Sequence, residues 1–204
     1  VIIPVFKVSS FIERCARSLF EQTLQDVEYI FVDDASPDDS IDILKRCIEC
    51  YPQRNEHVLI LPHEQNKGLP AARNTGLAVA TGEYVFHCDS DDWVELTMLE
   101  DLYLAAKEAD ADIVWCDWYL SFAQNERYMR QPEYSDCGDA LRGMLSGAMK
   151  YNVWNKLIRR EIYTKNDIGF PSGHSMGEDM TIMKLFVKSD KVCYVPKALY
   201  HYVR

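Results

Sequence analysis

Carboxylates gather at three places in the chain, in patterns that could bind a cation or move a proton. The densest group is Asp89-Ser90-Asp91-Asp92, which follows the apolar run YVFHC at 84–88. Side chains two residues apart on an extended segment point the same way, so Asp89 and Asp91 can face one ligand together. Mg²⁺ often binds one or two carboxylates plus substrate phosphates. The pattern suits a metal-bridged nucleoside diphosphate, although a turn that caps the next helix explains it too.

A second group, Asp33-Asp34, follows another apolar run. A carboxylate there could accept a hydrogen bond from a base N–H or a ribose hydroxyl. Asp38 and Asp39, a few residues on, are typical helix caps. An EF-hand loop is excluded, because Asp39 stands where that loop needs Gly and Lys45 stands where it needs Glu.

The third group is Glu178-Asp179, at the start of a segment with helical spacing. Acidic residues are ordinary at a helix N-terminus, where they interact with the helix dipole. One of them could also act as a general base that takes a proton from an attacking hydroxyl. Between the second and first groups, Arg73 lies in NKGLPAARNTG, which matches neither the P-loop nor the GxGxxG pattern. Arg73 could reach a phosphate or be a surface side chain.

Short apolar runs alternate with segments of helical spacing through the first half of the chain. This alternation predicts an α/β fold with a mostly parallel central sheet flanked by helices. Ligands of such sheets bind beyond the carboxyl ends of the strands, so the first two acidic groups should line one crevice. The expected strands are 1–6, 27–32, 57–61, 84–88 and 113–118, and the expected helices are 11–20, 40–48, 69–80 and 95–109.

The second half of the chain is less regular. No repeat or linker separates it from the first half, which favours a single domain. The expected elements are a loop or hairpin at 121–135, helices at 139–149 and 153–163, a loop at 168–177, a helix at 178–188 and a short strand at 192–195.

The composition excludes several functions. With 22 Lys+Arg against 32 Asp+Glu, the formal net charge is −10, which argues against a nucleic-acid binder or a polybasic membrane-surface protein. The seven cysteines are scattered, which favours reduced thiols and a cytoplasmic location. No apolar run approaches the roughly 20 residues of a membrane span. The chain starts without Met, so we expect that its natural N-terminus, and a C-terminal remainder, lie outside it.

Several segments together resemble glycosyltransferase family 2, whose members invert the anomeric centre and have the GT-A fold. They are, in chain order, VIIPVF, SLFEQT, YIFVDDASPDDS, NKGLPAARNTGLAVATGEYVFHCDSDDW, VWNKL and GEDM. The resemblance covers almost the whole chain. It implies one GT-A domain over 1–204, with a nucleotide-sugar-binding half at 1–118 and an acceptor-side half at 119–204.

The resemblance also implies roles for individual residues. Pro4, Val5, Phe6 and Asp34 would cradle the base and ribose, and Arg73 would help to hold the nucleotide. The chain departs from the usual Pro-x-Tyr-Asn of the family, because Phe6 stands in place of the tyrosine and Lys7 in place of the asparagine.

Asp89 and Asp91 match the DxD motif, in which Asp89 lies toward the ribose and the metal and Asp91 binds Mn²⁺ or Mg²⁺ directly. Asp179 matches the catalytic base of the ED motif, and Glu178 would support it. Trp154 and Lys156 lie in a segment that often lines the acceptor side.

The implied reaction moves a sugar from a nucleoside-diphosphate sugar, with UDP as the commonest carrier, to an acceptor hydroxyl. The acceptor would be a sugar, a lipid-linked sugar or a polysaccharide, in glycoconjugate synthesis at or near the inner face of a membrane. One alternative is a haloacid-dehalogenase-type phosphatase with Asp89 as nucleophile and Asp91 as acid/base, although its DxD normally ends the first strand. Another is a non-catalytic nucleotide- or carbohydrate-binding module.

Overall fold

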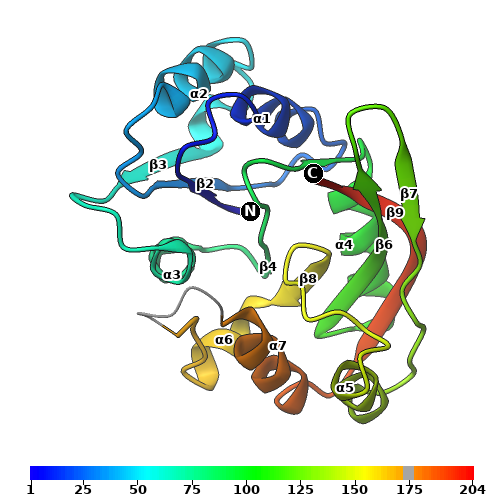
Figure 1. The fold of residues 1–204 in the computed structure, drawn as a ribbon. Helices are drawn as coiled ribbons and strands as arrows, with labels where there is room; N and C mark the ends of the chain where they lie inside the picture. The colour runs from blue at the N-terminus through cyan, green and yellow to red at the C-terminus, as the bar shows by residue number, and fades with distance from the viewer. Residues whose placement is uncertain (172–176) are drawn as a thin grey trace.

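Strands and helices alternate along the first half of the chain, as the apolar spacing predicts. The computed structural model describes residues 1–171 and 177–204 (Figure 1). Most observed boundaries lie within a few residues of the expected ones. The elements are β1 (Ile2–Val5), α1 (Ile12–Phe20), β2 (Tyr29–Asp33), α2 (Ser40–Glu49), a 3₁₀ turn (Asn55–His57), β3 (Val58–Pro62), α3 (Leu69–Val79), β4 (Tyr84–Phe86), β5 (Trp93–Val94) and α4 (Met98–Ala109).

The first sheet is parallel, with strand order β1-β2-β3. Helices α1 and α2 lie on one side of it and α3 lies on the other (Figure 1). Both faces of the strands are therefore buried, and neighbouring residues point into different layers. Ile3 packs with α1 and α2, whereas Ile2 packs with α3. This two-sided burial explains why β1 and β2 read as continuous apolar runs.

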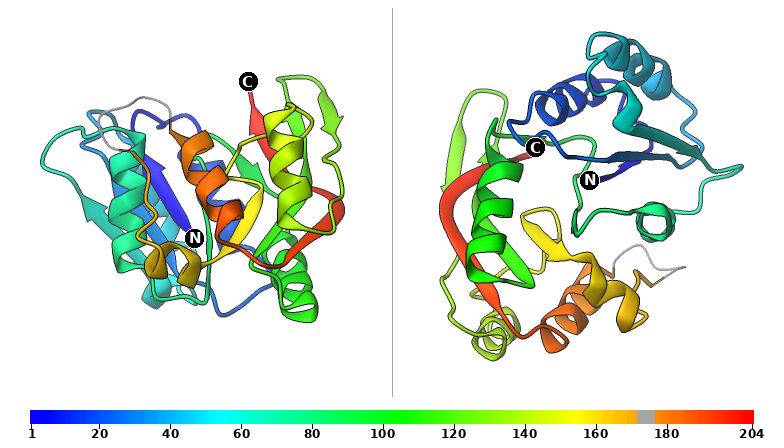
Figure 2. Two further views of the ribbon diagram at one scale, coloured as in Figure 1. Left: turned by 90° about the horizontal axis from the view of Figure 1, so that it is seen from below. Right: turned by 180° about the vertical axis from the view of Figure 1, so that it is seen from behind.

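The second sheet is mixed and mostly antiparallel. Its strand order is β4-β8-β6-β9-β5, with β7 paired to β6, and only β6 and β9 are parallel neighbours. A parallel bridge between Ile2 and His87 links the two sheets. Figure 2 shows β9 curving past α4. The remaining elements are β6 (Ile113–Ser121), β7 (Glu126–Met129), α5 (Cys137–Leu145), β8 (Lys156–Arg159), α6 (Arg160–Lys165), α7 (Glu178–Val187) and β9 (Val192–Val203).

Two predictions for the second half were wrong in part. The segment 153–163 was expected to be helical, but Lys156–Arg159 forms β8 between β4 and β6, and only the residues after it are helical. The last strand was expected to end at 195, but β9 continues to Val203. A bulge carries β9 past Pro196: Cys116 pairs with Val195 and Asp117 pairs with Ala198. The expected loop at 168–177 lies largely outside the described residues.

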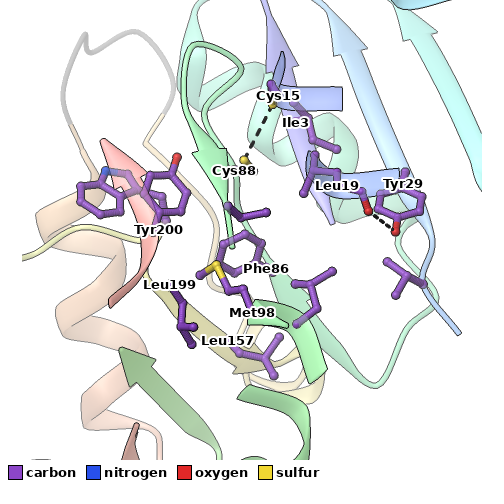
Figure 3. Close-up of a cluster of buried hydrophobic side chains, with 14 of the residues drawn as sticks. Ile3, Cys15, Leu19, Tyr29, Phe86, Cys88, Met98, Leu157, Leu199 and Tyr200 are labelled. Atoms are coloured by element: carbon purple, nitrogen blue, oxygen red, sulfur yellow. Dashed lines mark hydrogen bonds between the residues drawn. The ribbon is translucent and has the colours of Figure 1, made fainter. Parts of the chain in front are cut away.

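A large buried cluster joins the two sheets beneath the end of β4. Phe86 and Leu157 from neighbouring strands pack with Met98 of α4 and Leu199 of β9 (Figure 3). Burying each such side chain contributes about 1.5–3 kcal/mol relative to leaving it exposed. The end of β4 is therefore held rigidly, which matters because the DxD segment follows it.

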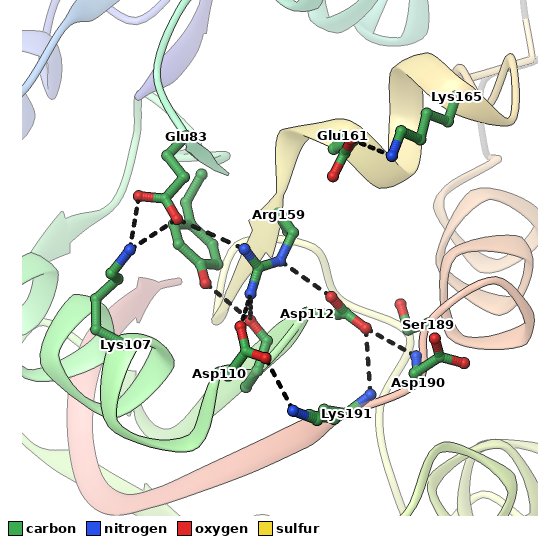
Figure 4. Close-up of polar contacts among 12 residues, drawn as sticks. Glu83, Lys107, Asp110, Asp112, Arg159, Glu161, Lys165, Ser189, Asp190 and Lys191 are labelled. Atoms are coloured by element: carbon green, nitrogen blue, oxygen red, sulfur yellow. Dashed lines mark hydrogen bonds and ion pairs between the residues drawn. The ribbon is translucent and has the colours of Figure 1, made fainter.

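An ion network fastens the second sheet at the edge shown in Figure 4. Arg159 of β8 donates to Asp112 at 3.0 Å and to Asp110 at 3.0 Å, and Lys191, directly before β9, donates to the same Asp110 at 2.8 Å. Lys107 of α4 adds a bond to Glu83 at 2.9 Å. The network ties β8 and β9 to the turn before β6.

Candidate active site

A cavity of about 390 Å³ lies at the carboxyl ends of β1 and β2, next to the start of α3 and the turn after β4. This is the edge at which ligands of parallel sheets bind. The predicted crevice is therefore present, and it brings together acidic residues that are far apart in the sequence. Its lining includes Pro4, Val5, Phe6, Asp34, Asp89 and Asp91, all of which were expected from the sequence to bind nucleotide or metal.

Asp34 is buried and organises the wall of this cavity. Its carboxylate accepts hydrogen bonds from the backbone N–H of Lys67 and of Gly68, each at 2.8 Å, and contacts His63 Nδ1 at 2.7 Å. Burial alone would raise the pKa of Asp34, but these hydrogen bonds hold it below its usual value. Gly68 has φ +87°, a conformation that favours glycine. Asp34 thus fixes the turn that leads into α3, and its contact with a base or ribose stays a prediction.

The three aspartates after β4 have different environments. Asp89 and Asp91 line the cavity, as predicted. Asp92 is fully buried, and its carboxylate accepts hydrogen bonds from the Tyr200 hydroxyl at 2.7 Å and the Val203 N–H at 2.8 Å. Burial, and then the charge of Asp89, raises the pKa of Asp91, and burial raises the pKa of Asp92 to about 8. Three carboxyl groups are therefore crowded at this turn, and burial favours the neutral form of Asp92.

Arg73 is not a surface side chain. It is 1% exposed, and its guanidinium donates to Asp89 at 2.7 Å and to Glu178. Arg73 lies on α3 and Glu178 begins α7, so the contact links two helices that are far apart in the sequence. Burial would lower the pKa of Arg73, but the two carboxylates raise it above its usual value. Arg73 therefore joins the DxD segment to the start of α7 through one buried cation.

Glu178 and Asp179 begin α7 but face different surroundings. Glu178 is partly buried against Arg73, whereas Asp179 is exposed. Within the part of the chain that the structure describes, the Asp179 carboxylate accepts only the N–H of its neighbour Met180, at 2.8 Å. Asp179 is thus the carboxylate of the pair that is open to a ligand.

The family model described as "Glycosyl transferase family 2" matches residues 1–182. The chain belongs to glycosyltransferase family 2. Membership confirms the resemblance read from the motifs and sets the phosphatase alternative aside.

Individual relatives of this family 2 domain agree with the assignment. A cholesterol galactosyltransferase of Borreliella burgdorferi is 34% identical over 98% of the chain and 58% of its own length. TarS of S. aureus, in a crystal structure with UDP-GlcNAc, superposes with a TM-score of 0.80 at 23% identity, over 99% of this chain and 57% of TarS 1–349. The mannosyltransferase PcManGT of Pyrobaculum calidifontis, in complex with GDP-Man and Mn²⁺, gives a TM-score of 0.72 at 20% identity, over 98% and 55% of the two chains.

These likenesses confirm the GT-A type of α/β fold. The family 2 domain spans 60% or less of the length of the first curated relatives it matches. Among the described residues, no helix is both long and apolar enough to cross a membrane.

Trp154 and Lys156 of the family 2 domain, expected on the acceptor side, are both buried. Trp154 stacks on Tyr200 with ring centroids 4.5 Å apart. The Lys156 ammonium donates to the carbonyl oxygens of Lys150 at 3.1 Å and Asn152 at 2.5 Å, and burial lowers its pKa to about 7. Both side chains hold the loop before β8 in place. Direct contact with an acceptor stays a prediction.

The carboxylates of the family 2 domain fit a divalent cation that is also held by substrate. Within 1–171 and 177–204, no three His, Cys, Asp or Glu side chains gather into a metal site. Asp89 and Asp91 nevertheless offer hard oxygen ligands at one cavity, where burial and then the charge of Asp89 raise the pKa of Asp91. Mg²⁺ commonly takes one or two protein carboxylates plus phosphate oxygens. The donor set therefore fits Mn²⁺ or Mg²⁺ together with a diphosphate.

Some residues of this site were missed in the sequence. The cavity is also lined by Asn66 and by Leu69, whose side chain is 39% exposed, as is that of Phe6. An exposed leucine directly after a Gly that starts a helix is a signal that could have been used. Nothing in the local sequence indicates that Tyr200 contacts the DxD turn.

Proposed function

We propose that this family 2 domain is an inverting, metal-dependent glycosyltransferase. It transfers a sugar from a nucleoside-diphosphate sugar, with UDP as the expected carrier, to an acceptor hydroxyl. The observation that carries the proposal is the buried bridge from Asp89 through Arg73 to Glu178. The Arg73 guanidinium donates one hydrogen bond to Asp89 at 2.7 Å and another to Glu178. The bridge joins the DxD turn to the start of α7, where the exposed Asp179 directly follows Glu178. A non-catalytic binding module would have no need of that last carboxylate.

The choice of donor is supported by the neighbours. TarS was crystallised with UDP-GlcNAc and with UDP, and PcManGT with GDP-Man and Mn²⁺. In this chain the nucleotide would lie in the cavity against Pro4, Val5 and Phe6, with Asp34 on its wall. The aromatic ring of Phe6, 39% exposed, offers a face for the base. Residues 1–118 would then bind the donor, and 119–204 would form the acceptor side.

Asp91 and Asp89 would hold the divalent cation, which neutralises the charge that grows on the leaving diphosphate. The remaining chemistry belongs to the chain itself. Asp179 accepts the proton of the acceptor hydroxyl, whose oxygen bonds to the anomeric carbon as the bond to the diphosphate breaks. A single displacement from the opposite face inverts that carbon. Glu178 cannot easily share this role, because its carboxylate is paired with Arg73.

The acceptor class follows from the relatives only as a proposal. We infer a saccharide, lipid-linked sugar or polysaccharide acceptor in glycoconjugate synthesis, with the domain in the cytoplasm or at the inner face of the membrane. The net charge of −10 disfavours nucleic acid as a partner.

The first test is the thermal stability of the chain with UDP-GlcNAc, GDP-mannose or TDP-glucose, each with Mn²⁺, Mg²⁺ or EDTA. A ligand that binds only the folded state at 100 times its Kd stabilises it by about 2.7 kcal/mol. We expect one nucleotide sugar to raise Tm only when metal is present, and Asp91→Asn to abolish that rise. If no donor stabilises the chain under any condition, the proposal fails.

The second test separates catalysis from binding. Asp179→Asn should keep the metal-dependent rise in Tm but lose release of nucleoside diphosphate from the donor by a factor of about 10² or more. The matched control is Glu108→Gln, which neutralises an exposed carboxylate on α4 and should leave turnover unchanged. Equal turnover in Asp179→Asn and the wild type would favour a different base. Binding without turnover in the wild type, with all acceptors offered, would favour the binding module.

A further inference from the structure

The end of β9 is hydrogen-bonded to the DxD turn through a chain of buried groups. The Asp89 N–H donates to the Tyr200 hydroxyl oxygen at 3.1 Å, and that hydroxyl donates to Asp92 at 2.7 Å. The other Asp92 oxygen accepts the Val203 N–H at 2.8 Å. Tyr200 and Asp92 are each 0% exposed. We call this set of hydrogen bonds the Tyr200 relay.

We propose that Tyr200 is a positioning residue that fixes the DxD turn so that Asp89 and Asp91 present their carboxylates to donor and metal. The proposal rests on the proposed function of the cavity. Between β4 and β5 the turn is not part of a strand, and its own backbone bond from Asp92 N–H to Asp89 C=O is 3.1 Å long. The Tyr200 hydroxyl links Asp89 and Asp92 a second time, by accepting from the Asp89 N–H and donating to the Asp92 carboxylate. Because Asp89 also binds Arg73, the turn is held from both sides.

The fold itself does not depend on this hydroxyl. The pairing of β5 with β9 is made by backbone bonds, with Trp93 opposite His201 and Val94 opposite Tyr200. The Tyr200 ring is held by packing, since it stacks on Trp154 at 4.5 Å and meets Phe86 edge-on at 6.3 Å. Removing the hydroxyl alone therefore leaves strand pairing and ring packing in place. What it takes away is the tie between β9 and the DxD turn.

The same ring connects the turn to the loop before β8. Trp154 of that loop stacks on Tyr200, and Lys156 holds the loop through the carbonyl oxygens of Lys150 and Asn152. Tyr200 thus contacts both the loop expected on the acceptor side and the turn expected to bind metal. This arrangement gives Trp154 a structural role through its stacking on Tyr200.

The experiment compares Tyr200→Phe with Tyr202→Phe in the full chain. Tyr202 is a matched control, because it lies on the same strand and stacks on the same Trp154 at 5.4 Å but takes no part in the Tyr200 relay. The first readout is amide hydrogen exchange at Asp89 without ligand. We expect Tyr200→Phe to speed this exchange about tenfold, the effect of one lost hydrogen bond, and Tyr202→Phe to leave it unchanged.

The second readout is the affinity for UDP in the presence of Mn²⁺, measured by titration calorimetry. Tyr200→Phe should weaken the Mn²⁺-dependent binding of UDP about tenfold while Tyr202→Phe stays within about twofold of the wild type. The proposal would be overturned if a folded Tyr200→Phe variant exchanged the Asp89 amide and bound UDP as the wild type does. If Tyr200→Phe does not fold, Asp92→Asn, which removes an acceptor of the relay, takes its place with the same expected changes.

The two readouts separate this proposal from the proposed function. If the wild type binds no nucleotide, the proposed function fails, whereas the exchange measurement still reports on the relay. If Tyr200→Phe speeds exchange at Asp89 but binds UDP and Mn²⁺ as the wild type does, the relay exists but does not position the site, and the proposal is overturned.

Discussion

Replacing Arg73 by Met should destabilise the fold strongly, because Arg73 is the cation that pairs with Asp89 and Glu178 in a largely buried cluster. Arg73 is 1% exposed and pairs with Asp89 and Glu178, whose side chains are 22% and 28% exposed. Breaking a buried ion pair by removing one partner costs about 3–5 kcal/mol, since the other charge stays buried without compensation. Water reaches both carboxylates in part, so we expect the lower end, about 3 kcal/mol. For a domain of this size that corresponds to a fall in Tm of roughly 6–12 °C.

The assay is urea-induced unfolding followed by circular dichroism, with EDTA present. The matched control is Arg142→Met, which breaks an exposed arginine–aspartate pair on α5 in which Arg142 is 72% exposed. Surface pairs contribute about 0–1 kcal/mol, so this control should unfold almost as the wild type does. If Arg73→Met lowers the free energy of unfolding no more than Arg142→Met does, the bridge does not stabilise the fold by the amount expected.

A second substitution tests the cause. If the cost of Arg73→Met comes from uncompensated negative charge, adding Glu178→Gln should recover part of it. The double variant would then be more stable than the sum of the two single effects predicts, by about 1 kcal/mol or more, as expected for residues in one network. Strict additivity would mean that Arg73 acts through packing alone, for instance against Phe170, whose ring lies 5.3 Å from the guanidinium.

Three further predictions concern stability. Gly76→Ala should cost about 1–3 kcal/mol in urea unfolding, because a Cβ there would lie 2.5 Å from Ile2 Cγ2 and push α3 off β1; an unchanged midpoint would contradict this packing. Burial lowers the pKa of Lys156 from 10.5 to about 7, so between these values the unfolded chain binds a proton that the native state lacks. The stability of the wild type relative to Lys156→Met should therefore rise from pH 7 to pH 10, and a flat difference would contradict the shift. The pKa of Asp34 is lowered from 3.8, so its stabilising effect is present above that value and is lost as pH falls through the lower folded-state pKa. Asp34→Ala should thus cost about 2 kcal/mol at pH 7 and progressively less on acidification, measured by denaturant unfolding across that range.

The first half of the fold could be predicted from the sequence because its signals are local. Strands β1 and β2 are apolar runs buried on both faces, and each ends close to a charged or polar residue. The topological rule for parallel sheets then predicts that Asp34, Asp89 and Asp91 meet at one crevice, and all three line the cavity. These predictions needed only spacing and the direction of the strands.

The second half was harder because its elements depend on distant partners. The apolar residues of Lys156–Arg159 are compatible with a helix. The segment forms a strand because it pairs with β4 on one side and with β6 on the other. Pro196 ends a strand in most sequences, yet β9 continues because a bulge accommodates it. In the site, Arg73 and Glu178 are 105 residues apart, and Asp92 and Tyr200 are 108 apart, so no local pattern connects them.

The acidic composition has a local explanation at the cavity. A net charge of −10 seems unsuited to a protein that binds a diphosphate. The buried guanidinium of Arg73 is already paired with Asp89 and Glu178 and is almost inaccessible to solvent. Asp91 and Asp179 are left exposed, one at the cavity and one at the start of α7. These exposed carboxylates would repel a diphosphate unless a divalent cation bound with it, which is why we expect donor binding and metal binding to be inseparable in this domain.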